Sequence, residues 1–412
     1  MKASLRLFLV TAVIGSLITA SSQCTRYEKL ENDPRGIEYA GAVSCAGCHK
    51  DIYNSYLETS HYQTSRPASP HTVEGSFSPG RNVFLLNDSM KVLMEEINGE
   101  LYQTGYIHGK KTERHRFDIT FGAGRSQTYL YWHGDTLFQL PVSYFAPASS
   151  WVNSPGYPAD HIYFNRLIVS RCFECHGSYI EKKPLQTQSL KIVDEFKKES
   201  LVYGIDCERC HGPAAKHVEF HAANPSEKKA KYITAVKGLS RQQQLDMCAV
   251  CHSGDQQKLQ KSTFSFQPGD LLSDFYFPDL SRPDISDFDV HGNQYQLLTS
   301  SQCFIQSNMD CSSCHNVHKK ENKDLAAAAS SCIKCHQDVK HTFTKEDPSL
   351  KAAEIENCID CHMPAKPSQL ISFRQTGGPE KLPYLVRTHR IAVYPQESAK
   401  IISWIRKQEI TE

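Results

Sequence analysis

The chain of 412 residues has no hydrophobic segment long enough to cross a membrane and no block of basic residues. Its longest apolar run covers residues 7–20, whereas a membrane-spanning helix needs about 20 apolar residues. Lysines and arginines are scattered, so a surface for nucleic acid is not expected. Only 40% of the residues are hydrophobic and the mean hydropathy is −0.47, which is modest for a chain of this length.

Two further absences narrow the function. The glycine-containing turn at residues 122–125 follows a strand pattern, but no helix pattern with dinucleotide spacing follows it. Nucleotide binding is therefore not expected. Methionine is scarce, with six residues, and Met247 and Met363 lie too close to the cysteine motifs described below to reach over a cofactor held there.

The short apolar run is typical of an export signal. Lys2 and Arg6 precede it, and we expect a secretory signal peptide at residues 1–23. Cys24 follows and resembles the cysteine that is acylated in lipoproteins, although Gln23 is larger than the residue usually found before it. Lipid attachment and ordinary cleavage that leaves Cys24 free both stay open. Either outcome predicts a protein of the periplasm or cell envelope, anchored to a membrane if it is lipidated.

Fourteen of the 16 cysteines form seven copies of the pentapeptide Cys-x-x-Cys-His, here numbered motifs 1 to 7 in chain order. Two thiols three residues apart share one face of a helical turn and can add to the vinyl groups of a haem, while the next residue supplies the proximal imidazole. The candidate attachment residues are Cys45, Cys48, Cys172, Cys175, Cys207, Cys210, Cys248, Cys251, Cys311, Cys314, Cys332, Cys335, Cys358 and Cys361. The candidate proximal ligands are His49, His176, His211, His252, His315, His336 and His362. The sequence therefore predicts seven covalently attached haem c groups.

Other uses of these cysteines explain less. Zinc ribbons also contain Cys-x-x-Cys pairs, but zinc binding leaves the histidine after every pair unexplained. A disulfide framework is disfavoured because nearly all the cysteines lie inside the pentapeptides. A catalytic set of serine, histidine and aspartate is not expected either, since the well-positioned histidines are better used at iron.

Seven macrocycles must supply much of the core of a chain this size, which accounts for its modest hydrophobic content. We expect a mainly α and irregular, haem-cored multihaem cytochrome c fold with a small β insertion. Short strands are predicted at 83–86, 101–103, 116–121 and 137–140, with turns at 98–99 and 133–135. The expected segments are a signal peptide at 1–23, a single-haem segment at 24–75 with a helix at 51–57, a β-rich insertion at 76–165, a six-haem domain at 166–395 and a C-terminal helix at 396–412.

Histidines outside the motifs are candidates for the second axial position. His318 follows the proximal His315 by only three residues, so it cannot reach the opposite face of the same haem. His61 would lie about 18 Å from His49 along a continuous helix. His217 is separated from its own motif by a proline. Each of these side chains should bind a neighbouring haem, which requires the haems to lie close together. Ligation by two histidines predicts reduction potentials toward the low end of the haem range.

Four stretches carry a more specific pattern. They are 45–49 followed by Tyr53, Tyr56 and 60–61; 210–213 with His217; 314–318; and 358–364 followed by 388–390. Together they resemble the cytochrome c-552/c-554 family of multihaem cytochromes, and the likeness extends over most of the mature chain, including 139–144. The resemblance implies that residues 166–395 form a six-haem domain like that of the cytochrome c-552/c-554 family.

The resemblance implies that His61, His217, His318 and His389 are distal ligands, and His291 and His341 are the candidates for a fifth and a sixth. Cys303 departs from the family pattern, because related chains often carry a histidine there before motif 5. The seventh iron then has either His221 or no protein ligand on its distal side.

The seventh iron separates two functions. An electron carrier needs every iron saturated, because fixed coordination keeps reorganisation small and excludes small ligands. A reductase or oxidase needs a vacant distal site. The chain lacks the Cys-x-x-Cys-Lys site of pentahaem nitrite reductases and has fewer motifs than octahaem hydroxylamine oxidoreductases. We therefore expect an exported heptahaem cytochrome that transfers electrons in a respiratory chain. The alternative is a multihaem oxidoreductase acting on a nitrogen or sulfur oxyanion, of the nitrite or hydroxylamine type, at one open haem.

The expected partners are redox proteins: a quinol-oxidising membrane complex, other cytochromes or a terminal reductase. Removal of residues 1–23 takes away two basic residues and no acidic ones, which changes the formal net charge from +1 to about −1. The haem propionates make the holoprotein more acidic still. Such a charge is compatible with basic redox partners and argues against nucleic acid.

Overall fold

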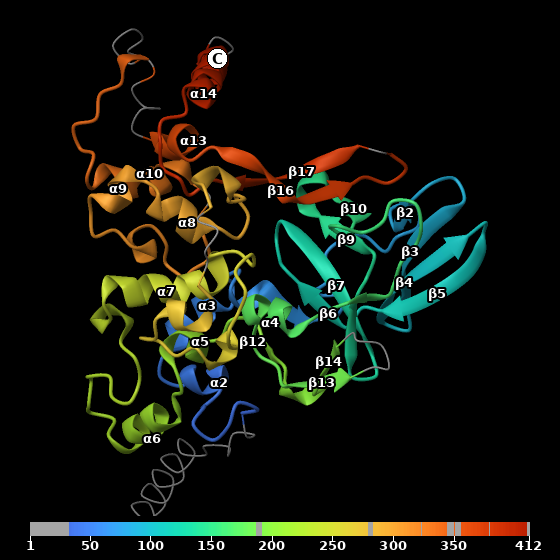
Figure 1. Ribbon diagram of the computed structural model, residues 1–412, viewed down its shortest axis with the longest axis horizontal. Helices are drawn as coiled ribbons and strands as arrows, with labels where there is room; N and C mark the ends of the chain where they lie inside the picture. The colour runs from blue at the N-terminus through green and yellow to red at the C-terminus, as the bar shows by residue number, and fades with distance from the viewer. Residues whose placement is uncertain are drawn as a thin grey trace, which may run out of the picture.

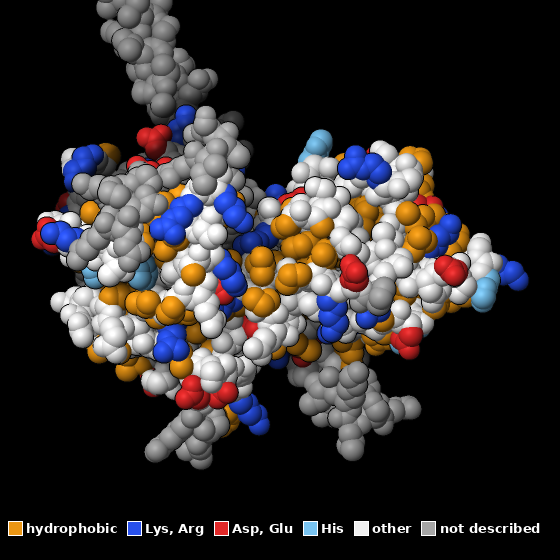
Figure 2. Space-filling model, turned by 90° about the horizontal axis from the view of Figure 1, so that it is seen from above, with side chains coloured by type: hydrophobic (Ala, Val, Ile, Leu, Met, Phe, Trp, Pro, Cys, Tyr) orange, Lys and Arg blue, Asp and Glu red, His pale blue; other side chains and the backbone are white. Residues whose placement is uncertain are grey.

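The protein has a helical lobe and a β-rich lobe (Figure 1). The computed structural model describes residues 33–186, 192–278, 283–322, 324–343, 350, 356–378 and 380–409. The expected signal peptide and Cys24 lie outside the described residues. Seen from above, acidic, basic and hydrophobic side chains are interspersed over both lobes (Figure 2). No helix in these ranges is long and apolar enough to span a membrane.

One sheet of the β-rich lobe is antiparallel, with the strand order β2-β3-β4-β5. Its strands are β2 (Val83–Leu85), β3 (Met90–Ile97), β4 (Glu100–Ile107) and β5 (Lys110–Arg116). Asn98 and Gly99 form the turn between β3 and β4, with φ angles of 53° and 80°. Positive φ at both positions is what a type I′ hairpin turn requires, which explains the Asn-Gly pair.

A second sheet of this lobe has the order β1-β6-β7-β8-β11, with β9 paired to β7 and β10 paired to β9. Its strands are β1 (Ser65–Pro67), β6 (Ile119–Phe121), β7 (Ser126–His133), β8 (Thr136–Gln139), β9 (Val142–Phe145), β10 (Ser150–Asn153) and β11 (Arg166–Leu167). Side chains from both sheets, including Phe84, Met94, Tyr129 and Trp151, are buried together. The β-rich lobe therefore has a hydrophobic core of its own.

The helical lobe consists mostly of short helices joined by loops (Figure 1). They are α2 (Ala42–Cys45), α3 (Lys50–Tyr56), α4 (Ser170–His176), α5 (Cys207–His211), α6 (Ala215–Ala223), α7 (Arg241–His252), α8 (Gln294–Thr299), α9 (Gln302–Ile305), α10 (Leu325–Ile333), α13 (Cys358–His362) and α14 (Pro395–Glu409). Most are shorter than the roughly 12–15 residues at which an isolated helix becomes stable in water. Their stability must come from tertiary contacts.

Three hairpin-like pairs lie outside the expected β insertion. β12 (Gly177–Tyr179) pairs with β15 (Val202–Tyr203), β13 (Lys182–Gln186) with β14 (Ile192–Phe196), and β16 (Ala365–Arg374) with β17 (Lys381–Arg387). The β16–β17 hairpin leaves the helical lobe and packs on the β-rich lobe (Figure 1). There the ring centroids of Phe373 and Phe145 are 4.7 Å apart, and the Leu85 amide donates to the Thr376 hydroxyl at 2.7 Å.

The prediction of a mainly α and irregular fold is wrong. The chain is 32% helical and 25% strand, and antiparallel sheets occur on both sides of residue 166. The β16–β17 hairpin has no clean strand pattern because Pro367 and Pro383 interrupt it, and proline cannot donate to a ladder. The structure accommodates Pro367 by a shift in pairing register between Pro367 and Ser372.

The predictions of individual strands and helices agree better with the structure than the predicted fold class does. The strands at 83–86, 101–103 and 137–140 are confirmed as β2, part of β4 and β8, and the helix at 51–57 is confirmed as α3. The segment 116–121 divides between the end of β5 and β6. The C-terminal helix is confirmed as α14. The boundaries between the expected segments stay predictions.

Candidate haem-binding sites

The pentapeptides lie on short helical turns. Helices α4, α5, α7 and α13 each end at the histidine of a motif. In three motifs the residue before the first cysteine caps the turn: the side chains of Asp206, Asp310 and Asn357 each accept a hydrogen bond from the backbone N–H three residues later. A side chain that accepts from this N–H stabilises the first turn. The caps therefore favour the helical turn that brings both thiols to one face.

Five motif histidines face a second histidine at nearly the same distance. The ring centroids are 6.4 Å apart for His49 and His217, 6.1 Å for His252 and His61, 6.0 Å for His211 and His318, 6.1 Å for His315 and His389, and 6.0 Å for His362 and His341. Two imidazoles that bind one metal ion from opposite sides, through bonds of about 2.0 Å, have centroids roughly 6 Å apart. The spacing fits axial ligation of an iron between each pair.

A sixth motif histidine, His176, lies within range of the charge of another histidine, His291. Burial lowers the pKa of His176 to about 4, and the nearby charge of His291 contributes to the shift. The Thr64 hydroxyl lies 3.0 Å from His176 Nδ1, and Phe121 stacks on the imidazole at 4.7 Å between centroids. Thr64 and Phe121 belong to the β-rich side of the chain, so this site combines residues from both lobes.

Hydrogen bonds fix the tautomer of several candidate ligands. The Nδ1 atoms of His217, His362 and His211 lie 2.8, 2.9 and 3.2 Å from the backbone carbonyl oxygens of Lys231, Ala392 and Thr234. A ring nitrogen must donate to a carbonyl oxygen, so the lone pair of these imidazoles is on Nε2. An imidazole held in this way presents Nε2 to a metal.

Burial favours the neutral imidazole at other sites. Burial is the largest of the effects that lower the pKa of His61 and of His389 to about 4. Burial lowers the pKa of His252 as well. Neutral imidazole is the form that binds iron. These side chains are therefore in the ligating form at neutral pH.

Cysteines of different motifs lie in pairs. Four pairs of thiols lie close enough to shift each other's pKa: Cys45 and Cys207, Cys175 and Cys251, Cys248 and Cys311, and Cys332 and Cys358. All cysteines in the described ranges are free of disulfide bonds. Each thiol would carry the edge of a different haem, so paired thiols require porphyrin edges to approach each other.

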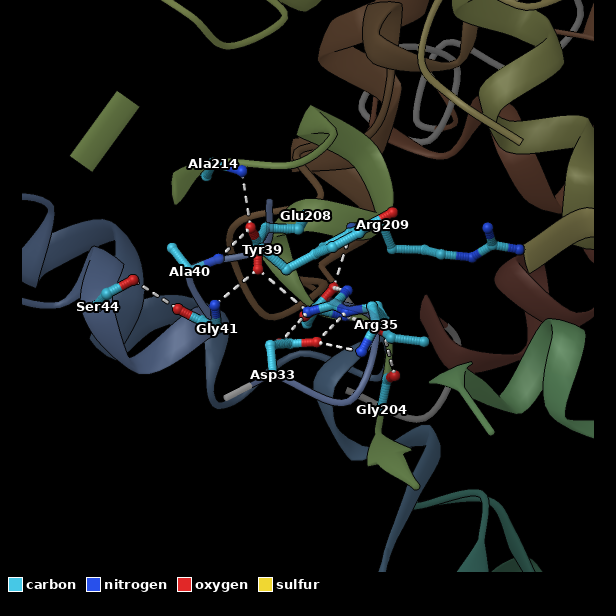
Figure 3. Close-up of polar contacts among 12 residues, drawn as sticks. Asp33, Arg35, Tyr39, Ala40, Gly41, Ser44, Gly204, Glu208, Arg209 and Ala214 are labelled. Carbon is cyan, nitrogen blue, oxygen red and sulfur yellow. Dashed lines mark hydrogen bonds and ion pairs between the residues drawn. The ribbon is translucent and has the colours of Figure 1, made fainter. Parts of the chain in front are cut away.

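Motif 3 is tied to the N-terminal part of the chain through Glu208, which lies between its two cysteines (Figure 3). The Glu208 side chain is 1% exposed and accepts hydrogen bonds of 2.8 Å from the backbone N–H groups of Ala40 and Ala214. Arg35 Nη2 lies 3.1 Å from Glu208 and 2.7 Å from Asp206. These contacts hold the turn of motif 3 against the segment that leads into motif 1.

Replacing this carboxylate should destabilise the holoprotein. In Glu208→Gln, Arg35 loses one of its buried acidic partners and a backbone N–H faces an amide, so we expect a loss of about 3 kcal/mol. A lower thermal midpoint by circular dichroism would report it. Glu219→Gln removes the same charge at an exposed position of α6 and is the matched control. Equal midpoints for the two variants would contradict the anchoring role.

Three candidate residues are not brought into a facing pair in the described ranges. His336 is exposed, and no second histidine ring faces it there. His221 lies beside His217, with 4.6 Å between centroids, and its buried Nε2 has no hydrogen-bond partner among the described residues. Cys303 is close enough to Cys332 for its pKa to be raised by that thiol, after a larger effect of burial.

Several residues that contact the candidate ligands are not predictable from the motifs. Besides Thr64 and Phe121, the Gln294 side chain lies 3.3 Å from His252 Nδ1. These residues belong to no motif, and they reach the histidines from distant positions in the sequence. No local signal marks them, because only the tertiary fold brings them to the ring nitrogens.

Comparison with known proteins agrees with this chemistry. The family model described as "Cytochrome c554 and c-prime" matches residues 163–212, which include motifs 2 and 3. The solved structure titled "Crystal Structure of Outer Cell Wall Cytochrome OcwA" is similar in fold, with a TM-score of 0.51 and 17% identity over 88% of this chain and 81% of that chain. No curated protein matches the sequence. Together with the paired imidazoles, these similarities support a multihaem c-type cytochrome that carries covalently bound haem c and takes part in electron transfer.

Proposed function

We propose that the protein is an exported heptahaem cytochrome that transfers electrons through closely packed haems in a respiratory chain. The observation that carries the proposal is the set of five histidine pairs, in which a motif histidine faces a histidine outside the motifs at about 6 Å. When a segment that binds one haem also supplies a ligand to the next haem, the same stretch of chain holds both haems. Such a ligand would keep the two haems close together and in a fixed orientation.

The proposed axial pairs join six of the seven motifs to a histidine outside the motifs. They are His49 with His217, His176 with His291, His211 with His318, His252 with His61, His315 with His389, and His362 with His341. Haem supplies one-electron chemistry at iron when it is bound. At these six sites the protein would supply two imidazoles to the iron, which would leave no open position there, keep ligand rearrangement small on electron transfer and favour low potentials.

Contacts between the cysteines suggest an order for the conduit. The thiols of motifs 1 and 3, 4 and 5, and 6 and 7 form the neighbouring pairs described above. Cysteines also lie near each other between motifs 3 and 4 (Cys210 and Cys248) and between motifs 5 and 6 (Cys314 and Cys332). Motif 2 contacts motif 4 through Cys175 and Cys251. We propose a main path through motifs 1, 3, 4, 5, 6 and 7, with motif 2 as a branch.

The two ends of this path are the proposed contact points for redox partners. Exposed hydrophobic side chains lie near both: Val43 on α2 beside motif 1 is 68% exposed, and Trp404 on α14 is 59% exposed. If Cys24 is lipidated, the nine residues to Asp33 reach at most about 30 Å, which would keep motif 1 near the membrane. A quinol-oxidising complex would then supply motif 1, and another cytochrome or a terminal reductase would take electrons from the far end.

The location is proposed as periplasm or cell envelope. The similar structure is that of a cytochrome of the outer cell wall, which agrees with a site outside the cytoplasm. Haem-binding motifs and the apolar run at residues 7–20 point the same way.

Intact-mass spectrometry of the secreted protein tests the proposal. The expected mass is that of the mature chain plus seven haems, with acyl chains if Cys24 is lipidated. Potentiometric titration should find most midpoints below zero volts, because histidine pairs lack the methionine that raises the potential. A mass without added tetrapyrrole would refute the haem assignment, and midpoints mostly well above zero volts would refute the ligand scheme.

A further inference from the structure

Motif 6 differs from the other motifs in that no second histidine ring faces its histidine among the described residues. His336 is exposed, as are Lys334 and Cys335 on the same turn, and it shares this exposure with His49 and His315. Beside them is an open hollow of about 450 Å³, which is also lined by Gln337 and Asp338. The other motif histidines have a second histidine within reach, and no imidazole in the described ranges occupies that position at His336.

The remaining histidines of the chain are accounted for elsewhere. His341, which follows His336 by five residues, faces His362 of motif 7. His221 lies against His217 on α6. The other five non-motif histidines belong to the β-rich lobe or the segment leading into it, at positions 71, 108, 115, 133 and 161. The segments outside the described residues contain no histidine.

The methionine and cysteine side chains that could serve as sulfur ligands also have other neighbours. Met247 and Met309 pack in hydrophobic clusters around α7 and α8. Cys303 lies near the attachment thiols Cys332 and Cys314. A thiolate from Cys303 is a defined alternative that spectroscopy distinguishes.

We infer that the haem held by Cys332, Cys335 and His336 keeps an open, solvent-accessible sixth position, which binds a small uncharged diatomic ligand such as carbon monoxide when the iron is ferrous. The inference rests on the proposed haem attachment and concerns the one motif for which no second histidine is proposed among the described residues. Access and ligation of the distal side decide whether a haem iron takes such a ligand. Binding here forms one iron–carbon bond, transfers no electrons and displaces no protein side chain.

Carbon monoxide titration of the dithionite-reduced holoprotein tests the site. The expected result is saturation at about one carbon monoxide per seven haems, with one high-spin ferric iron per protein in the electron paramagnetic resonance spectrum of the oxidised form. Seven haems by mass with every iron low-spin and no carbon monoxide bound would overturn the inference and leave the electron-transfer proposal intact. A low-spin thiolate signal that disappears in Cys303→Ser would also overturn it.

Variants assign the site. Cys332→Ala/Cys335→Ala should retain six haems and lose carbon monoxide binding, whereas Cys45→Ala/Cys48→Ala should also retain six haems and keep it. If binding survives loss of the motif 6 haem, the open iron lies elsewhere and the assignment is wrong. The stoichiometry and spin count of the unmodified protein decide the matter even if a variant does not fold.

Discussion

Expressed in the cytoplasm without residues 1–23, so that no haem is attached, the chain is expected to lose the structure of its helical lobe and keep that of its β-rich lobe. The helices α2, α5, α9 and α13 are four or five residues long, far below the length that is stable in isolation. Burial of the macrocycles would provide most of the apolar contact that holds them. The β-rich lobe has its own core around Tyr129, Leu140 and Trp151.

Limited proteolysis with mass spectrometry measures this difference. Fragments that cover roughly residues 65–167 should survive in the haem-free chain, while motifs 3 to 7 are cleaved at many positions. The secreted holoprotein is the control and should resist cleavage in both lobes. Equal protection of the two lobes in the haem-free chain would show that the helical lobe does not depend on the cofactors.

His318→Met should raise the midpoint potential of one haem by on the order of 0.1 V or more and leave the other six near their original values. The His318 ring faces His211 at 6.0 Å with 16° between the ring planes, as expected for two imidazoles on one iron. A thioether donates less electron density than imidazole and stabilises the ferrous state. Spectroelectrochemical titration of the intact protein would resolve the shifted component.

The matched control for this substitution is His71→Met. His71 is exposed and lies in the segment leading into the β-rich lobe, away from every motif. It should leave all seven potentials unchanged. If His318→Met behaves like His71→Met, His318 is not an axial ligand and the proposed link between motifs 3 and 5 fails.

Acidic residues inside the motifs show how the polypeptide holds its haem turns. Glu174 in motif 2 accepts hydrogen bonds from the hydroxyls of Ser262, at 2.7 Å, and Thr263, at 3.0 Å. Asp360 in motif 7 pairs with Arg387 at the end of β17. Together with Glu208, these carboxylates connect the variable positions of the pentapeptides to distant segments. The two x positions of these motifs thus have a structural role that the pentapeptide pattern does not reveal.

The axial partners were only partly predictable. His318, three residues after His315, was expected to bind another haem because of the reach of its side chain, and in the structure its ring faces His211. No local constraint of this kind indicates a partner for His389. His389 lies 74 positions after His315 and reaches that ring only because the chain returns after β17. The fold class was predicted wrongly for a related reason, because strands such as β16 are specified by pairing with β17 more than by their own residues.

The sequence by itself determined the chemistry of the cofactor sites, because covalent attachment depends on two thiols and an imidazole at fixed local spacing, which needs no tertiary information. It also determined the hairpin turn at Asn98-Gly99, where positive φ selects the residues. Only the tertiary structure decided which histidine faces which motif, which thiols meet, and that His336 faces solvent. Those features join residues far apart in the chain, and contacts of that kind depend on how the whole polypeptide packs.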